Sequence, residues 1–81
     1  MTFGVYCVRD AKVGFATPNV DSNDATAMRN FAFALSGRNN TVMSFRKEDF
    51  DLFKLGVFDS VTGEIIPCNP TIVCSGASLE V

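Results

Sequence analysis

The strongest structural signal in this 81-residue sequence is the segment FDLFKLGVFDSVTGEII, residues 50–66. Residues 52–58 carry apolar side chains on both sides of an extended chain, which is typical of a strand buried on much of both faces. Residues 59–63 end in glycine, as hairpin loops do when their last residue adopts the left-handed conformation, and residues 64–66 supply a returning strand that Pro67 ends. The segment therefore predicts a β-hairpin with a central strand.

A second extended segment lies at the start of the chain. Residues 3–9 alternate between two faces and are rich in β-branched and aromatic side chains, so they predict the first strand. A polar turn leads to residues 13–17, a weaker strand that Gly14 and Pro18 place at a sheet edge. An alternative topology leaves this second segment irregular and the sheet three-stranded.

Residues 22–36 have the pattern of an amphipathic helix. Helix-capping residue types are concentrated at positions 21–24, where acidic groups also complement the helix dipole. Gly37 is expected to end the helix in the left-handed conformation. The apolar side chains expected on the buried stripe are Met28, Phe31, Ala32 and Leu35.

Phe33 points about 160° away from Leu35 on a helix with 100° per residue. It is therefore expected on the side of the helix opposite the stripe. One interpretation is an isolated exposed ring, or one covered by the C-terminal tail; the other is an interface with a second subunit or a partner.

The order of these elements predicts an α+β fold with β-β-α-β-β order. One helix packs on one face of a mostly antiparallel sheet of three to four strands. The chain, residues 1–81, is predicted to be a single domain in which residues 75–81 fray. Because a lone helix leaves the second sheet face in water, Phe53 and Phe58 join Phe33 as predicted interface residues.

The composition excludes much of enzyme chemistry. The chain has no histidine and no tryptophan, which removes the commonest general base and every Ser-His or Cys-His pair. Asp51 starts a strand and Asp59 starts a turn, so structural roles for these carboxylates are favoured over a paired-carboxylate site. No catalytic residue, metal site or cofactor is predicted.

The three cysteines are interpreted as reduced thiols. Cys7 falls in the first strand as a small buried side chain, while Cys68 and Cys74 are six residues apart with no histidine to complete a metal site. The first residues lack the pattern of a signal peptide, and no apolar run approaches the roughly 20 residues that span a bilayer. We expect a soluble protein without membrane contact.

Basic and aromatic residues leave a second function open. Arg38, Arg46 and Lys47 are the best candidates for binding nucleic acid, with Tyr6, Phe15 or Phe45 as a stacking surface. Seven basic against nine acidic residues give a net charge of −2, whereas a non-specific binder usually carries a positive excess. The alternative interpretation is a solvated surface of mixed charge.

Residues 50–59 together with Thr62-Gly63-Glu64-Ile65 resemble the conserved core of the small non-structural protein of gokushovirus-type microviruses. The pattern Ala27, Arg29, Phe31 of the helix is similar too, and the resemblance covers roughly residues 3–67. It implies a single-stranded DNA phage protein, made in the host bacterial cytoplasm, with a role in genome replication or in the switch to single-stranded DNA synthesis and packaging. It implies no catalytic residue.

Two classes of function follow. The favoured hypothesis is a non-enzymatic accessory protein that forms a homodimer or higher homo-oligomer and binds a viral or host replication protein. The alternative is a single-stranded DNA-binding protein, whose affinity must fall steeply with salt.

Overall fold

The computed structural model describes residues 1–37 and 40–80 of the chain. It contains five strands: β1 (Thr2–Asp10), β2 (Gly14–Phe15), β3 (Asn19–Asp21), β4 (Phe50–Asp59) and β5 (Ile65–Ser75). The helical elements are α1 (Asp24–Leu35), the one-turn α2 (Val42–Phe45), and the 3₁₀ turns η2 (Lys47–Asp49) and η3 (Gly76–Ser78). No helix in these ranges is both long and apolar enough to cross a bilayer.

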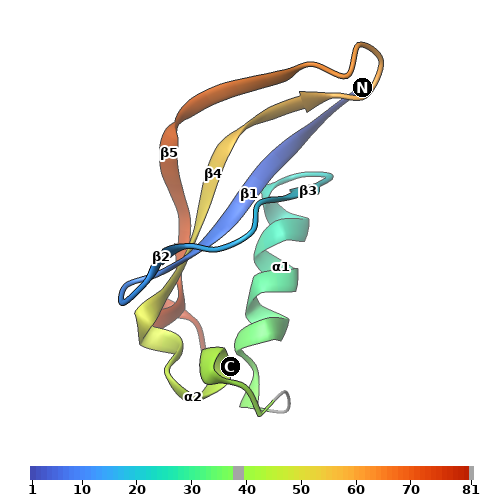
Figure 1. The fold of residues 1–81 in the computed structure, drawn as a ribbon. Coiled ribbons are helices and arrows are strands. Elements are labelled where there is room, and N and C mark those ends of the chain that lie inside the picture. The colour runs from blue at the N-terminus through green and yellow to red at the C-terminus, as the bar shows by residue number, and fades with distance from the viewer. Residues whose placement is uncertain (38–39, 81) are drawn as a thin grey trace.

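The strands form one antiparallel sheet in the order β2-β1-β4-β5, and β3 pairs with the same edge of β1 as β2. Helix α1 lies against one side of the sheet, and the β4–β5 hairpin continues well past the start of the helix (Figure 1). The α+β class and the central position of β4 agree with the sequence prediction. The sheet is curled (Figure 1) and contains five strands, whereas three to four were predicted; the additional strand is β3.

Two glycines give the hairpin its shape. Gly63 closes the loop with a φ of 78°, in the left-handed conformation that the sequence predicted. At Gly56 a side chain has no room, because a Cβ atom there would lie 2.4 Å from the carbonyl oxygen of Ile66. The register of β4 against both neighbouring strands also shifts between Lys54 and Gly56. Such a bulge bends a strand, so β4 bends beside the point where the backbone of β5 lies closest to it.

Helix α1 begins where its capping residues predicted. The Asn23 side chain accepts a hydrogen bond of 2.9 Å from the Thr26 N–H, which satisfies one of the donors left over at the start of the helix. The prediction for its other end was wrong, because Gly37 does not have a positive φ. The chain leaves the helix through Ser36 in an extended conformation, so no left-handed residue is needed there.

The core lies between α1 and the sheet. Met28 is 36% exposed, so its predicted place in the buried stripe was wrong, and Ala27 takes that place. The helix therefore packs through positions four residues apart, which run almost straight along one side. The buried apolar side chains of this core are Tyr6, Ala27, Phe31, Leu35, Phe50 and Leu52.

The last strand was predicted too short. β5 does not stop at Pro67 but continues through Pro70 to Ser75. Both prolines fit because β5 is an edge strand, where an absent N–H costs nothing on the outer side. After β5, Gly76 is buried and the Lys47 ammonium donates to the carbonyl oxygen of Leu79, which attaches the described part of the tail to the core.

Candidate interaction surface

The sheet side opposite α1 carries cross-strand rows of side chains. We call it the open face, and strand pairing assigns its members because directly opposed residues share a side. Three rows are apolar, and the fourth holds Arg9 and Asp51 between Phe15 and Ser75. The apolar members of the open face are Phe3, Phe58 and Ile65; Val20, Val5 and Pro67; and Cys7, Phe53 and Ile72.

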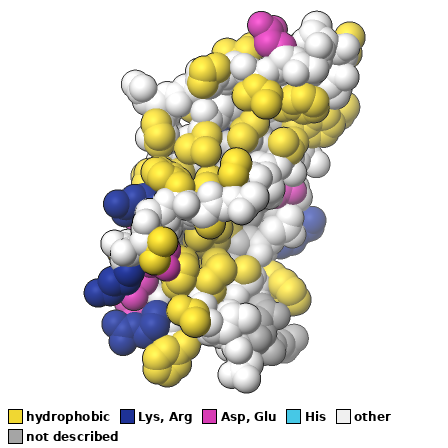
Figure 2. Space-filling view, in the orientation of Figure 1, with side chains coloured by type: hydrophobic (Ala, Val, Ile, Leu, Met, Phe, Trp, Pro, Cys, Tyr) yellow, Lys and Arg dark blue, Asp and Glu magenta, His cyan; other side chains and the backbone are white. Residues whose placement is uncertain are grey.

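Much of the open face is in contact with water. Ile65 is 63% exposed, Ile72 53% and Val20 48%, and Val5 and Phe53 are half-buried. Cys7 is fully buried within the single copy. In the space-filling view, hydrophobic side chains gather along the strands, while Lys and Arg side chains cluster with acidic ones at the lower left (Figure 2). The accessible surface of 5241 Å² exceeds the roughly 4,800 Å² of a compact monomer of this mass.

Aromatic rings occupy the end of the open face nearest the charged row. The Phe15 and Phe53 rings meet edge to face with centroids 5.4 Å apart. The Arg9 guanidinium lies 6.0 Å from the centroid of Phe15. A cation over a ring and a T-shaped pair are both favourable arrangements, so these side chains hold a defined geometry on an exposed surface.

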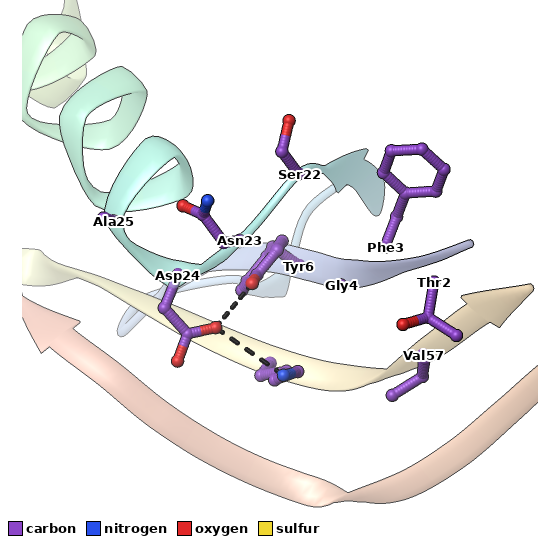
Figure 3. A pocket seen from close by; sticks show the side chains of 10 residues that line it. Thr2, Phe3, Gly4, Tyr6, Ser22, Asn23, Asp24, Ala25 and Val57 are labelled. Atoms are coloured by element: carbon purple, nitrogen blue, oxygen red, sulfur yellow. Dashed lines mark hydrogen bonds and ion pairs between the residues drawn. The ribbon is translucent and has the colours of Figure 1, made fainter.

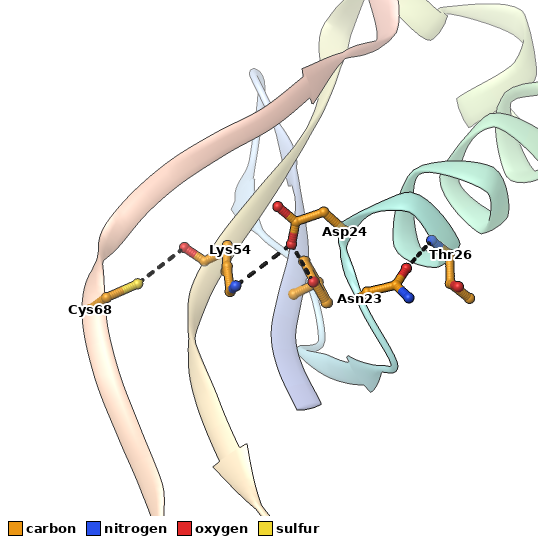
Figure 4. Close-up of polar contacts among 6 residues, drawn as sticks. Asn23, Asp24, Thr26, Lys54 and Cys68 are labelled. Carbon is orange, nitrogen blue, oxygen red and sulfur yellow. Dashed lines mark hydrogen bonds and ion pairs between the residues drawn. The ribbon is translucent and has the colours of Figure 1, made fainter. Parts of the chain in front are cut away.

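On the helix side, a groove of about 460 Å³ lies between the start of α1 and strands β1 and β4. The Tyr6 hydroxyl donates to the Asp24 carboxylate at 2.5 Å, and the Lys54 ammonium lies 3.6 Å from the same oxygen (Figures 3 and 4). Burial, together with the acceptor and charge of Asp24, raises the pKa of Tyr6 well above its ordinary value. The phenol therefore remains a neutral donor across the physiological pH range.

Gly4 makes this arrangement possible. A Cβ atom at Gly4 would lie 2.3 Å from the Tyr6 hydroxyl oxygen, so the absent side chain leaves the space that the ring fills. The Asp24 carboxylate thus accepts a hydrogen bond from the Tyr6 phenol and pairs with the Lys54 ammonium. This is an arrangement that ties the first turn of α1 to β1 and β4, and we assign it a structural role.

The thiols and carboxylates also have structural surroundings. Burial raises the pKa of both Cys7 and Cys74, which keeps these thiols protonated and weakly nucleophilic. The Asp59 carboxylate accepts the N–H of Val61 at 2.9 Å, the turn role that the sequence predicted. Among the described residues, no cluster of cysteines and carboxylates has the make-up of a metal site.

The predicted interface residues fall on two separate surfaces. Phe53 and Phe58 are half-buried members of the open face. Phe33 is 65% exposed on α1, the helix that covers the other side of the sheet. The structure therefore places two of the three predicted residues together and the third apart from them.

The predicted nucleic-acid residues have partners within the chain where the structure describes them. The Arg46 guanidinium lies 3.2 Å from the Glu48 carboxylate and 3.8 Å from that of Asp49. The Lys47 ammonium donates a hydrogen bond to the carbonyl oxygen of Leu79, and Arg38 lies outside the described residues. This end of the molecule is a surface of mixed charge.

Sequence reasoning missed several members of the open face. Val20 belongs to a three-residue strand with no recognisable pattern, and Ile72 follows two prolines that signal the end of a strand. The sequence also could not predict that Arg9 lies opposite Asp51, because this depends on the register between β1 and β4. Only the excess of apolar residues in β4 signalled that a second face existed.

Comparison with known proteins identifies a family. The family model described as Phage ORF5 protein matches residues 3–79, which is nearly the whole chain. No curated protein and no solved structure matches this chain.

Proposed function

The chain belongs to the family of phage ORF5 proteins, and from this premise we propose that it is a non-enzymatic accessory protein of a phage. Its proposed task is in genome replication, or in the switch to single-stranded DNA synthesis and packaging, within the host bacterial cytoplasm. Residues 50–59 resemble the small non-structural protein of gokushovirus-type microviruses, which supports a single-stranded DNA phage as the source.

The observation that carries this proposal is the open face. An apolar sheet side without a covering helix is typical of a surface that contacts another macromolecule. We propose that the protein self-associates, as a homodimer or higher homo-oligomer, and binds a viral or host replication protein. A non-enzymatic role is supported by the groove beside α1, whose acid, phenol and amine are already engaged with one another.

Sedimentation velocity over the low to high micromolar range tests this proposal. Self-association predicts a mass above 8.8 kDa that rises with protein concentration. The variants Phe53→Asp and Phe33→Asp place a charge on the open face and on α1 respectively, and the variant whose mass falls identifies the surface that associates. Circular dichroism of each variant checks that it is still folded. A wild-type mass that stays monomeric throughout the range contradicts self-association.

Single-stranded DNA binding is the second candidate function. The observation that favours it is the Arg9 guanidinium above the exposed Phe15 ring, since bases stack on such surfaces beside a cation. Arg38, Arg46 and Lys47 are the further proposed contacts. Titration of a labelled oligonucleotide at two salt concentrations separates the functions, because electrostatic binding must weaken steeply as salt rises.

A further inference from the structure

We propose that the open face binds the same face of a second copy of this chain, so that the two sheets stack into a closed, two-fold symmetric sandwich. This inference rests on the proposed self-association and specifies its surface and geometry. It depends on three features of the structure: edges that resist further strands, a charged row that is complementary to itself, and the size of the face.

The edges of the sheet are poorly suited to adding strands from another copy. β5 forms one edge, and its Pro67 and Pro70 have no N–H to offer a neighbouring strand. The other edge is divided between β2 and β3, which are two and three residues long. Short or proline-containing edges discourage open-ended growth of a sheet, so association through the face is favoured.

The charged row makes the open face complementary to itself. Arg9 on β1 lies directly opposite Asp51 on β4, and both lie on the open face. Neither side chain takes part in an ion pair with another of the described residues. A two-fold axis parallel to the strands and between β1 and β4 brings Arg9 of one copy over the second copy's Asp51. The same symmetry generates the reciprocal pair.

This symmetry also matches the apolar rows. β1 of each copy then lies over β4 of the other, so Phe3 faces the second copy's Phe58 within the same row. Sheets that stack face to face commonly keep their strands within about 30° of each other, which this axis allows. The apolar rows thereby become an interior, and the charged row closes one end of it.

The size of the face sets the expected strength of association. Four strands at about 4.8 Å and seven residues of β1 at about 3.4 Å each cover a plane of roughly 400 Å². Side chains add accessible area to that plane, which brings the face close to the smaller specific interfaces, with about 600 Å² per partner. We therefore expect a reversible dimer in the micromolar range.

A charge-exchange experiment tests this geometry. Arg9→Glu and Asp51→Lys each place like charges across the proposed interface twice, and each is expected to weaken dimerisation at least tenfold. The double variant restores opposite charges and is expected to recover most of the wild-type affinity. The charge-matched controls are Arg29→Glu on α1 and Glu64→Lys in the hairpin loop, which should leave the dimer unchanged. Denaturant unfolding of every variant, at a concentration where it is monomeric, checks that the fold persists.

The outcomes separate this inference from the proposed function. A dimer that neither single exchange weakens, or that the folded double variant fails to restore, overturns the sandwich while self-association through another surface stands. A wild-type chain that remains monomeric overturns both. If the chain stays monomeric but binds a single-stranded oligonucleotide with an affinity that falls steeply with salt, the sandwich is overturned and the alternative function is supported.

Discussion

At the scale of single residues, the fold depends on glycines that leave room for a neighbour. Tyr6 is fully buried, and its ring lies where the side chain of residue 4 would otherwise be. From there its hydroxyl reaches Asp24 in the first turn of α1. A glycine in a strand usually weakens it, so its presence at position 4 is explained by the ring that it accommodates.

We expect Gly4→Ala to lower the free energy of unfolding by roughly 1–3 kcal/mol, the usual cost of overpacking a filled site. The Cβ atom would lie within 2.5 Å of three Tyr6 atoms, so the ring or the strand must move. Urea denaturation followed by circular dichroism measures the loss. Gly37→Ala is the matched control, because a Cβ there meets nothing within 4 Å. Equal stability of the two variants would contradict this account.

We expect stability to be constant near neutral pH and to fall in alkali. The folded protein raises the pKa of Tyr6, Cys7 and Cys74, so it holds these protons more tightly than the unfolded chain. That stabilisation is complete below the ordinary values of 9.0 for the thiols and 10.0 for the phenol, and it is lost as the pH rises beyond them.

Urea midpoints measured from neutral pH to about pH 11 check this prediction, since linkage gives stability a slope wherever the two states bind different numbers of protons. Tyr6→Phe removes the phenol proton but keeps the ring. Its midpoint should be lower at neutral pH, because the hydrogen bond to Asp24 is absent, and should change less above pH 10. A variant and wild type with parallel alkaline curves would show that Tyr6 does not contribute.

At the scale of elements, the sequence predicted the features that interactions between near neighbours in the chain stabilise. The cap at Asn23 and the loop glycine at Gly63 each stabilise the element in which they occur, and both lie where the sequence placed them. β3 and the second half of β5 gave no such signal. A three-residue strand beside β1 and an edge strand through Pro67 exist because of tertiary pairing, which no short window of sequence contains.

We expect Asn23→Ala to destabilise the protein by about 1 kcal/mol through loss of the helix cap. The Asn23 side chain accepts from Thr26, and the donor would otherwise have to be satisfied by water. Asn23→Asp is the matched control, because it keeps an acceptor and adds a charge that the helix dipole favours. Thermal unfolding of the three proteins gives the comparison, and an alanine variant as stable as the aspartate variant would contradict the role of the cap.

At the scale of the whole molecule, the sheet is larger than the helix that covers it. The radius of gyration is 12.8 Å, against about 11.7 Å for a compact chain of this length. The six side chains of the main buried cluster all lie on the side of α1, and Cys7 is the one open-face side chain among the described residues that is fully buried. The sequence predicted this imbalance through Phe53 and Phe58, but only the register shows which residues share the open face.

A chain with this imbalance should become more stable when its second face is covered. Dimerisation of the folded state alone shifts the unfolding equilibrium by mass action, so the melting temperature should rise with protein concentration. For a domain of this size, each kcal/mol gained corresponds to roughly 4–8 °C. Scanning calorimetry across a hundredfold range of concentration measures the rise. Phe53→Asp should melt at one temperature throughout the range, because a charge at the centre of the open face prevents the contact. A wild-type melting temperature that does not change with concentration would mean that no second copy stabilises the folded chain.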